Sequence, residues 1–392
     1  MRRARLPITA GDVALGLGVA MGVFALFAFG ITDYRERIES SSDFSGFWAG
    51  PRAIVLGIDP YDPQVWIRTA AELGTKLPDT DVYAYPPWVA FALLPFGLLP
   101  LSIATDVWTG LGLVVAVIAL RGLLQVTVPD IPLVHWVAGV ALLVSQPGIA
   151  TYFNGQWTYF LLAASIGVYL LHAARPALAG VLALSALLKP QLFVFALWSW
   201  LRAAAARGRF RMFALTSLGG AALIVAAAAL ITPRWLEAWF TRALTIRVTD
   251  PTTPTLTAAF ADIVGDVAPF AAAATLLVAV VLALRFDPSQ RAWWTVWPAL
   301  SILGATYTRS YDQLLLLPPL IVSTAVVAES SRRKAVAYAA LWATVLLPGS
   351  LALQGLAAYR ERENFTIALT AVVFLIFVLV HRPSDRSTVT SS

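Results

Sequence analysis

The chain of 392 residues is 59% hydrophobic and only 13% charged, with a mean hydropathy of +0.74. A soluble domain carries nearly twice that charged fraction, so the composition excludes an ordinary soluble protein. The net charge of +6 does not indicate nucleic-acid binding, because most arginines lie in short clusters between apolar runs. The absence of cysteine excludes disulfides, and the three scattered histidines do not suit a zinc site.

Apolar runs of about 18 to 25 residues recur along the chain, which is the length of a helix that crosses a bilayer. They predict an all-α, polytopic integral membrane protein with about twelve transmembrane helices. The first run, residues 12–32, is too long for the core of a signal peptide and is predicted to be the first crossing. We expect a single transmembrane domain over residues 1–381 and a disordered cytoplasmic tail over 382–392.

The arginine clusters predict the orientation, because cytoplasmic loops of membrane proteins are enriched in Lys and Arg. They place both termini in the cytoplasm and three segments outside: a long first loop over 33–85, a second loop over 232–255 and a short turn over 307–312. The abundance of arginine and alanine suggests a GC-rich bacterial genome, and hence a bacterial plasma membrane. The clusters are MRRAR at the start, RAAAARGRFR at 202–211, Arg285 with Arg291, RRK at 332–334, and HRPSDR at the end.

Residues 86–200 allow two topologies. Five simple crossings would place Arg121 and Arg175 outside and the sequence NGQ (154–156) inside. Alternatively, the prolines of YPPWVAFALLPFGLLP make this stretch a short surface or re-entrant segment, and residues 176–201 divide into two half-helices at LKPQ.

We prefer the divided topology for two reasons. It returns Arg121, His172 and Arg175 to the cytoplasmic side, where positive charge is favoured. It also places Lys189 outside rather than near the bilayer midplane, where a lone cation costs at least about 2.5 to 3.5 kcal/mol.

The first external loop contains the stretch SSDFSGFWAGPRAIVLGIDPYDP, residues 41–63. Ser or Asp begins a helix there, and the aromatic spacing suits a helix that lies in the membrane interface. On these residues alone, Asp43 is either a helix N-cap or a functional carboxylate. Further along, Asp79-Thr80-Asp81 could hold a divalent cation, but this spacing is common in solvated loops, so we predict no metal site.

Three later segments carry polar residues beside apolar runs. Lys189, in ALSALLKPQLFVFAL, is either a cation for an anionic headgroup or a lysine that extends from a helix end to the membrane surface. YFNGQWTYF, with Asn154 and Gln156, is either a ligand-binding segment or a polar turn. YTRSYDQ brings Arg309 and Asp312 together, and the alternative there is a local ion pair.

Several motifs together resemble glycosyltransferase family 87 of the GT-C superfamily, in the same order along most of residues 1–330. They are DFSGFWAGPRAIVLGIDPYDP, YAYPPWVAFALLPFGLLP, NGQWTYFLL, GVLALSALLKPQLFVFAL and SYDQLLLLPPL. The resemblance implies a GT-C-like membrane fold and transfer of a sugar, most often mannose, from a polyprenyl phosphate. It also implies that Asp43 is the catalytic carboxylate. The external histidine usual in the family is replaced by Arg309, Tyr311 and Asp312.

The chemistry of such a transfer needs one base and positive charge. A carboxylate takes the proton of the attacking hydroxyl, and a phosphate leaves without protonation, so a single base suffices and inversion is expected. We predict Asp43 as the base and Lys189 and Arg309 as ligands of the donor phosphate. The predicted substrate-binding residues are Tyr85, Asn154, Gln156, Tyr311 and Asp312.

The predicted partners are a polyprenyl-phosphate sugar, a lipid or glycan acceptor and membrane lipids, with no cofactor, metal or nucleic acid. Two alternative functions remain open at this point, one enzymatic and one in transport. One is an arabinofuranosyltransferase that uses polyprenyl-phosphate arabinose. The other is a transporter or flippase of lipid-linked sugars, although the internal repeat typical of transporters is not found.

Overall fold

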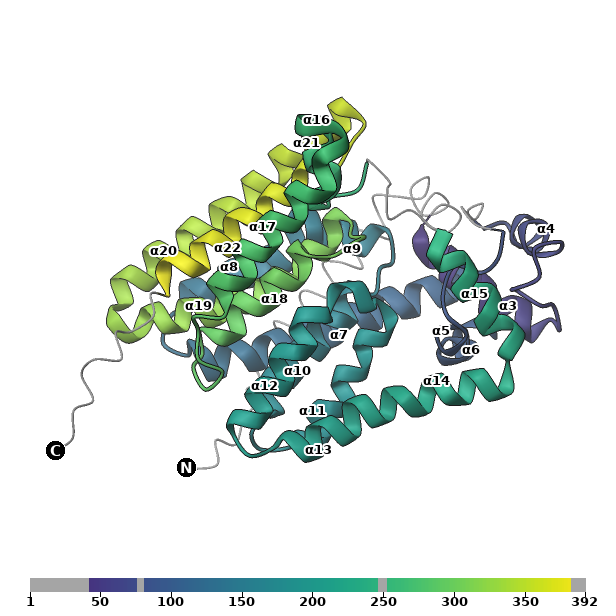
Figure 1. Ribbon diagram of the computed structural model, residues 1–392, viewed down its shortest axis with the longest axis horizontal. Coiled ribbons are helices and arrows are strands. Elements are labelled where there is room, and N and C mark those ends of the chain that lie inside the picture. The colour runs from purple at the N-terminus through teal and green to yellow at the C-terminus, as the bar shows by residue number, and fades with distance from the viewer. Residues whose placement is uncertain (1–41, 76–80, 246–251, 382–392) are drawn as a thin grey trace.

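A computed structural model of the chain describes residues 42–75, 81–245 and 252–381 (Figure 1). Over these residues the protein is all-helical and contains no β-strand, which confirms that the fold is all-α. The predicted crossing at 12–32 and the predicted tail after residue 381 lie outside the described residues.

The described part of the first loop and the proline-rich stretch that follows it fold into short helices. They are α3 (Asp43–Val55), α4 (Trp66–Glu72), α5 (Pro87–Ala92) and α6 (Leu94–Gly97). α5 and α6 are short because prolines occupy their first turns, where the missing N–H is tolerated, and Pro100 precedes the next helix. The sequence therefore correctly predicted both the helix in the first loop and the proline-broken segment.

The aromatic face of α3 corrects one expectation. Phe44, Phe47 and Trp48 are buried in the protein core rather than placed in the membrane interface. The Trp48 indole donates hydrogen bonds to the carbonyl oxygens of Phe96 and Leu99, at 3.1 and 3.0 Å, so α3 packs against α6. Residues 47–51 are all buried, so the helix is enclosed by protein on every side over that turn and a half.

The next four helices contain two that pack side by side and two that form a bend. α7 (Leu101–Thr127) packs along α10 (Thr158–Leu171). Between these two in the chain, α8 (Pro132–Val144) and α9 (Gln146–Phe153) meet at an angle of 45°. The turn over residues 154–156, between α9 and α10, is where the candidate site begins.

The predicted division at LKPQ is present. α11 (Pro176–Ala183) continues as a 3₁₀ turn, Leu184–Leu188, which ends at Lys189. A second 3₁₀ turn, Pro190–Leu192, leads into α12 (Val194–Ala206). Pro190 cannot continue the helix of the preceding residues, and the break leaves Lys189 outside helical geometry, at φ −143° and ψ 70°.

The next helices form an outer layer. α13 (Phe210–Ala214) and α14 (Gly220–Ile231) are joined by a π-helical turn into one span, which runs along the lower edge of Figure 1. α15 (Pro233–Thr245) then contacts α5, and α16 (Leu256–Val264) leads into α17 (Ala268–Ala283).

The last third of the chain supplies the most buried helices. α18 (Trp293–Leu303) and α19 (Leu317–Ser330) are linked through a 3₁₀ segment, Ser310–Leu316, that is buried throughout. α20 (Arg332–Thr344) packs against α19, α22 (Ile367–Val380) packs against α18, and α21 (Ser350–Arg360) contacts α9. These three helices lie in the upper part of Figure 1.

The described residues contain five helices long and apolar enough to cross a membrane, or six if α8 and α9 form one bent span. Shorter apolar helices of 10–17 residues accompany them. The prediction of about twelve crossings is therefore not confirmed, because only five or six of the described helices meet the length of a span. Prolines and 3₁₀ turns cut several apolar runs into pieces that are too short to span alone. The long spans are Leu101–Thr127, Phe210–Ile231, Leu256–Ala283, Ser310–Ser330 and Arg332–Arg360.

Three of the arginine clusters lie together. The Arg207 guanidinium donates to the carbonyl oxygens of Pro288 and Ser289, at 3.2 and 2.9 Å, and Arg291 pairs with Glu329 at 3.0 Å. The His172 ring lies 4.4 Å from the Trp294 ring, so the C-terminal end of α10 is at this same end. The turn over residues 154–156 lies at the opposite, N-terminal end of α10. Since α10 has 14 residues and a helix rises 1.5 Å per residue, its two ends are about 21 Å apart.

Candidate functional site

The start of α3 is anchored on the turn between α9 and α10. Ser42 is the N-cap residue, and its side chain accepts a hydrogen bond from the Ser45 amide. Capping therefore does not explain Asp43, the first residue of the helix. The backbone N–H of Phe44 donates to the carbonyl oxygen of Asn154 at 3.2 Å, which brings Asp43 beside the turn.

Gly155 makes this close approach possible. Its φ is +58°, and a Cβ at this position would lie 2.6 Å from the Cβ of Phe44. Both the left-handed backbone and the missing side chain therefore require glycine. The Trp108 indole donates to the Gly155 carbonyl oxygen at 2.8 Å and stacks on Phe44 at 5.3 Å, so the turn is fixed from α7 as well.

The turn presents Gln156 to Asp43. The Nε2 of Gln156 donates to the Oδ2 of Asp43 at 2.5 Å, and its backbone N–H is held by the Thr151 carbonyl at 2.9 Å. Gln156 is only 3% exposed, whereas Asp43 is partly exposed. Among the described residues the Gln156 Oε1 is buried without a hydrogen-bond partner. Such a group retains the capacity to accept a hydrogen bond from a ligand hydroxyl.

A buried ion pair lies next to this carboxylate. Lys189 Nζ donates to Asp312 Oδ1 at 2.8 Å, and the side chains are 9% and 1% exposed. The ammonium also lies 4.6 Å from the centre of the Tyr311 ring. The lysine is therefore paired inside the protein rather than extended to a membrane surface, and the ion pair of Asp312 reaches a segment 123 residues away.

Asp312 has further donors that hold its carboxylate in place. Its Oδ2 accepts from the backbone N–H of Arg309 at 3.1 Å and from the Thr308 hydroxyl at 3.4 Å. Its Oδ1 accepts from the Thr158 hydroxyl at 3.3 Å. Because Thr158 begins α10, two residues after Gln156, the same helix start reaches both acids.

The 3₁₀ segment that carries Asp312 is fastened to α9. The Gln146 amide donates to the Ser310 hydroxyl at 3.0 Å, and the Thr151 hydroxyl lies 3.5 Å from the carbonyl oxygen of Tyr311. α9 is thus a common support for the turn beside Asp43 and for the segment that carries Asp312.

Tyr85 and Tyr307 complete the polar cluster. Burial and then the nearby Asp43 carboxylate raise the pKa of Tyr85 well above its usual value, with smaller contributions from Tyr83, Tyr307 and Asp312. Tyr85 therefore stays a neutral phenol at physiological pH and can donate a hydrogen bond. The Tyr307 hydroxyl accepts from the Arg309 Nε at 3.2 Å, so Arg309 also faces this region.

The structure thus brings most predicted site residues into one neighbourhood. Asn154 contributes through its backbone, while its side-chain amide donates to the Ala150 carbonyl at 2.9 Å and closes α9. Sequence reasoning missed the other polar residues that hold the cluster. Gln146, Thr158, Tyr307, Thr308 and Ser310 belong to this set. Tyr307 lies in YTRSYDQ and could have been found there.

The D-x-D segment is not part of this neighbourhood as far as it is described. Asp79 and Thr80 lie outside the described residues, and Asp81 forms an ion pair with Arg242 of α15 at 3.1 Å. In the described ranges, no three His, Asp or Glu side chains are placed to hold a metal ion.

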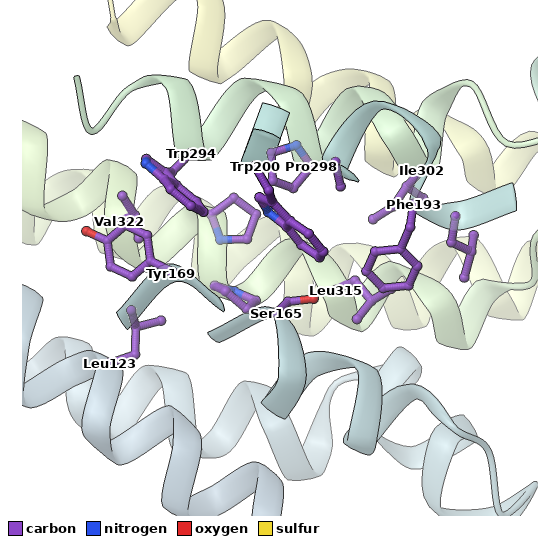
Figure 2. Close-up of a pocket in the computed structure, with 14 residues that line it drawn as sticks. Leu123, Ser165, Tyr169, Phe193, Trp200, Trp294, Pro298, Ile302, Leu315 and Val322 are labelled. Carbon is purple, nitrogen blue, oxygen red and sulfur yellow. The ribbon is translucent and has the colours of Figure 1, made fainter. Parts of the chain in front are cut away.

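A separate cavity lies deeper in the helices (Figure 2). It has a volume of about 40 Å³ and is lined mainly by apolar and aromatic side chains from α7, α10, α12, α18 and α19, including Trp200 and Trp294. Its hydroxyl at Ser165 donates to the Leu161 carbonyl oxygen at 2.8 Å. The residues that line the cavity include none of the predicted site residues, so the cavity is separate from the cluster around Asp43.

Comparison with known protein families identifies the family of this chain. The model of glycosyltransferase family 87 matches residues 83–292, which is more than half of the chain. The matched part contains Tyr85, Gln156 and Lys189, whereas Asp43 precedes it and Asp312 follows it. No curated protein and no solved structure matches. With its apolar spanning helices and a family model that covers more than half of its length, the chain belongs to glycosyltransferase family 87 and is a membrane glycosyltransferase.

Proposed function

We propose that this enzyme transfers mannose from a polyprenyl phosphate to a lipid or glycan acceptor at the external face of a bacterial plasma membrane. The observation that carries the proposal is the partly exposed Asp43 carboxylate, which lies in one polar cluster with Tyr85 and the Lys189–Asp312 pair. The cluster lies at the end of α10 opposite to the joined arginine clusters, which supports an external site.

Asp43 would act on the acceptor. Its carboxylate takes the proton of the acceptor hydroxyl while that oxygen attacks the anomeric carbon of the donor sugar. The bond between this carbon and the phosphate oxygen breaks, and the phosphate leaves with the electron pair. Attack opposite to the leaving group inverts the configuration at the anomeric carbon. Gln156 orients the carboxylate for this step through its hydrogen bond to Oδ2.

The leaving phosphate would be stabilised by Lys189 and Arg309. Negative charge that develops during bond cleavage is favoured by cations already in place. Asp312 orients the ammonium of Lys189 and reduces its net charge in the resting enzyme. Tyr85 offers a neutral hydroxyl donor, and Tyr311 packs beneath the ammonium. We assign Asp312 a positioning role, because it holds the ammonium of Lys189. Asn154 also has a positioning role, because its backbone carbonyl holds the start of α3 beside the turn over residues 154–156.

The test is transfer by purified enzyme in liposomes supplied with labelled polyprenyl-phosphate mannose or polyprenyl-phosphate arabinose and a mixture of acceptor lipids. We expect labelled product from the mannose donor, with inverted anomeric configuration by NMR. Product from arabinose alone would favour the arabinofuranosyltransferase. Movement of labelled donor across the bilayer without any product would contradict the proposal and favour a flippase.

Gln156 should contribute to the rate by holding the Asp43 carboxylate in place. Its amide donates to Asp43 Oδ2, and Gln156→Met keeps the length of the side chain but removes this donor. We expect a lower kcat with little change in KM for the donor, because the base loses its orientation while the contacts of the donor remain. Transfer rates and the melting temperature in detergent, compared with those of the unchanged enzyme, would check this. An unchanged kcat would mean that Gln156 does not position the base.

A further inference from the structure

A further carboxylate, Glu363, lies in the short loop between α21 and α22. The span Arg332–Arg360 begins at the end of the molecule where Arg291 pairs with Glu329, and it ends just before this loop. Glu363 therefore lies at the opposite end of the molecule, where the turn over residues 154–156 also lies. None of the roles assigned above uses this acid.

The backbone of Glu363 is fastened to the 3₁₀ segment that carries Asp312. Its carbonyl oxygen accepts from the backbone N–H and the hydroxyl of Thr366, at 2.9 and 2.8 Å. The Thr366 carbonyl oxygen in turn accepts from the side-chain amide of Gln313, the residue after Asp312, at 2.8 Å. The Glu363 N–H donates to the carbonyl oxygen of Thr252 at 3.0 Å. Glu363 is therefore held in a fixed position at the edge of the polar cluster.

The side chain of Glu363 has an acceptor that nothing uses. The residue is half-buried, and among the described residues its Oε2 is buried without a hydrogen-bond partner. The donors on either side of it in the chain are occupied elsewhere. Arg362 and Asn364 donate to the two oxygens of Asp262, each at 2.7 Å. A buried carboxylate oxygen that lacks a donor is costly, so this one is suited to a donor that a ligand supplies.

The Glu363 carboxylate also acts on Arg309, a proposed ligand of the donor phosphate. Burial lowers the pKa of the Arg309 guanidinium, but Tyr307 and, less strongly, Glu363 raise it above its usual value. Charges influence each other in this way only over short distances, so the two groups are neighbours. A phosphate held by Arg309 would be repelled by Glu363, because both are negative. The ligand groups left for the carboxylate are hydroxyls, which donate to it.

We propose that Glu363 is a specificity-determining residue whose carboxylate accepts a hydrogen bond from a hydroxyl of a sugar bound at the polar cluster. The inference rests on the proposed function, because it takes this cluster to be the place of sugar transfer. The hydroxyl belongs either to the sugar of the donor or to a sugar of the acceptor, and the two arms of the test distinguish these sources.

The test removes hydroxyls from the substrates one at a time. Glu363→Met keeps the length of the side chain and removes both oxygens, whereas Glu363→Gln keeps one acceptor oxygen. Each variant is assayed in liposomes with polyprenyl-phosphate mannose and with donors that lack one hydroxyl of the mannose. In the second arm, the acceptors are glycolipids that lack one hydroxyl of the sugar. The matched control is Glu361→Met, because Glu361 is an exposed acid of the same loop.

We expect the unchanged enzyme to use one deoxy substrate with a kcat/KM about 10- to 100-fold lower than that of the complete substrate. This is the usual effect of one hydrogen bond to a charged group. Glu363→Met should use both substrates equally poorly, Glu363→Gln should lie between, and Glu361→Met should match the unchanged enzyme. The arm in which the difference disappears identifies the sugar.

A role of Glu363 in the fold alone, or in balancing the charge of Arg309, gives a different result. Glu363→Met would then lower kcat/KM by the same factor for every substrate in both arms. Either this result or an unchanged kcat/KM for every substrate would overturn the inference.

A binding measurement separates the inference from the proposed reaction. The probes are a polyprenyl phosphonate of mannose, in which a methylene group replaces the anomeric oxygen so that transfer is blocked, and the acceptor glycolipid. Each is titrated, with its deoxy series, against the enzyme in detergent and followed by tryptophan fluorescence. Glu363→Met should bind one complete probe about tenfold more weakly and its deoxy form no differently from the unchanged enzyme. This result, in an enzyme that transfers no sugar from any donor, would contradict the proposed function alone. Equal binding of every probe by both proteins would contradict the inference.

Discussion

Replacing Asp43 with Asn should lower the rate of sugar transfer by about 10² to 10⁴-fold, the usual contribution of a general base. The amide has nearly the shape of the carboxylate, and its oxygen can still accept the hydrogen bond from Gln156. It cannot take the proton of the acceptor hydroxyl. The loss should therefore fall on kcat, while KM for the donor changes little, as measured with labelled donor in liposomes.

The matched control for this variant is Asp62→Asn. Asp62 lies in the same loop, and its carboxylate accepts from the backbone N–H of Gln64 at 2.9 Å, a bond that an amide oxygen can replace. This control should retain full transfer. An Asp43→Asn enzyme that transfers sugar at the rate of the control would rule out Asp43 as the base. A lower melting temperature of Asp43→Asn relative to the control would indicate that its effect is partly structural.

Replacing Lys189 with Met should affect both stability and transfer. The change leaves the Asp312 carboxylate buried without its cation, which typically destabilises a protein by about 3 to 5 kcal/mol. Loss of a preorganised positive group at the leaving phosphate should also lower kcat by about 10² to 10³-fold. Thermal unfolding in detergent, followed by tryptophan fluorescence, and the transfer assay would measure the two effects separately.

The double variant Lys189→Met/Asp312→Asn separates the structural role of the pair from its chemical role. Removing both charges should recover most of the stability, because the introduced amide oxygen can take the place of Oδ2 and accept from the Arg309 backbone N–H and the Thr308 hydroxyl, while its NH₂ group can donate to the Thr158 hydroxyl. Transfer should remain low, since the phosphate still lacks its cation. Recovery of transfer together with stability would show that the pair serves the fold alone.

Local chemistry in the sequence was sufficient to predict several elements of the fold. Prolines predicted the short helices near Pro87 and Pro95 and the break at Lys189, because a proline acts on its immediate neighbours. The number of crossings was not predictable in the same way. An apolar run has the same composition whether it forms one straight helix or two short pieces joined by a 3₁₀ turn.

The environment of α3 shows a related limit. The spacing of Phe44, Phe47 and Trp48 correctly indicated a helix with an aromatic face. It did not indicate what that face meets, since lipid and protein interior both favour apolar rings. The structure places this face against protein, because Trp48 donates to the carbonyl oxygens of Phe96 in α6 and of Leu99 after it, and the Trp108 ring of α7 stacks on Phe44.

For the candidate site, the sequence supplied chemically suitable residues but not their partners. Asp312 was predicted beside Arg309 because they are neighbours in the chain, and a local ion pair was the simple alternative. Its ion pair is with Lys189, 123 residues earlier, and Gln156 reaches Asp43 across 113 residues. Such pairs depend on how α9, α10 and the 3₁₀ segment are packed, and no local pattern encodes that.

These separations also set an order of events during synthesis. A ribosome that adds about 5 to 20 residues per second needs about 6 to 23 s to proceed from Asp43 to Gln156, because the two are 113 residues apart. Lys189 is made 123 residues before Asp312, so its ammonium enters the membrane environment before that carboxylate exists. A nascent chain that ends before Asp312 cannot contain the complete polar cluster. The enzyme therefore acquires this arrangement only late in membrane insertion, when the segment leading into α19 docks on α9.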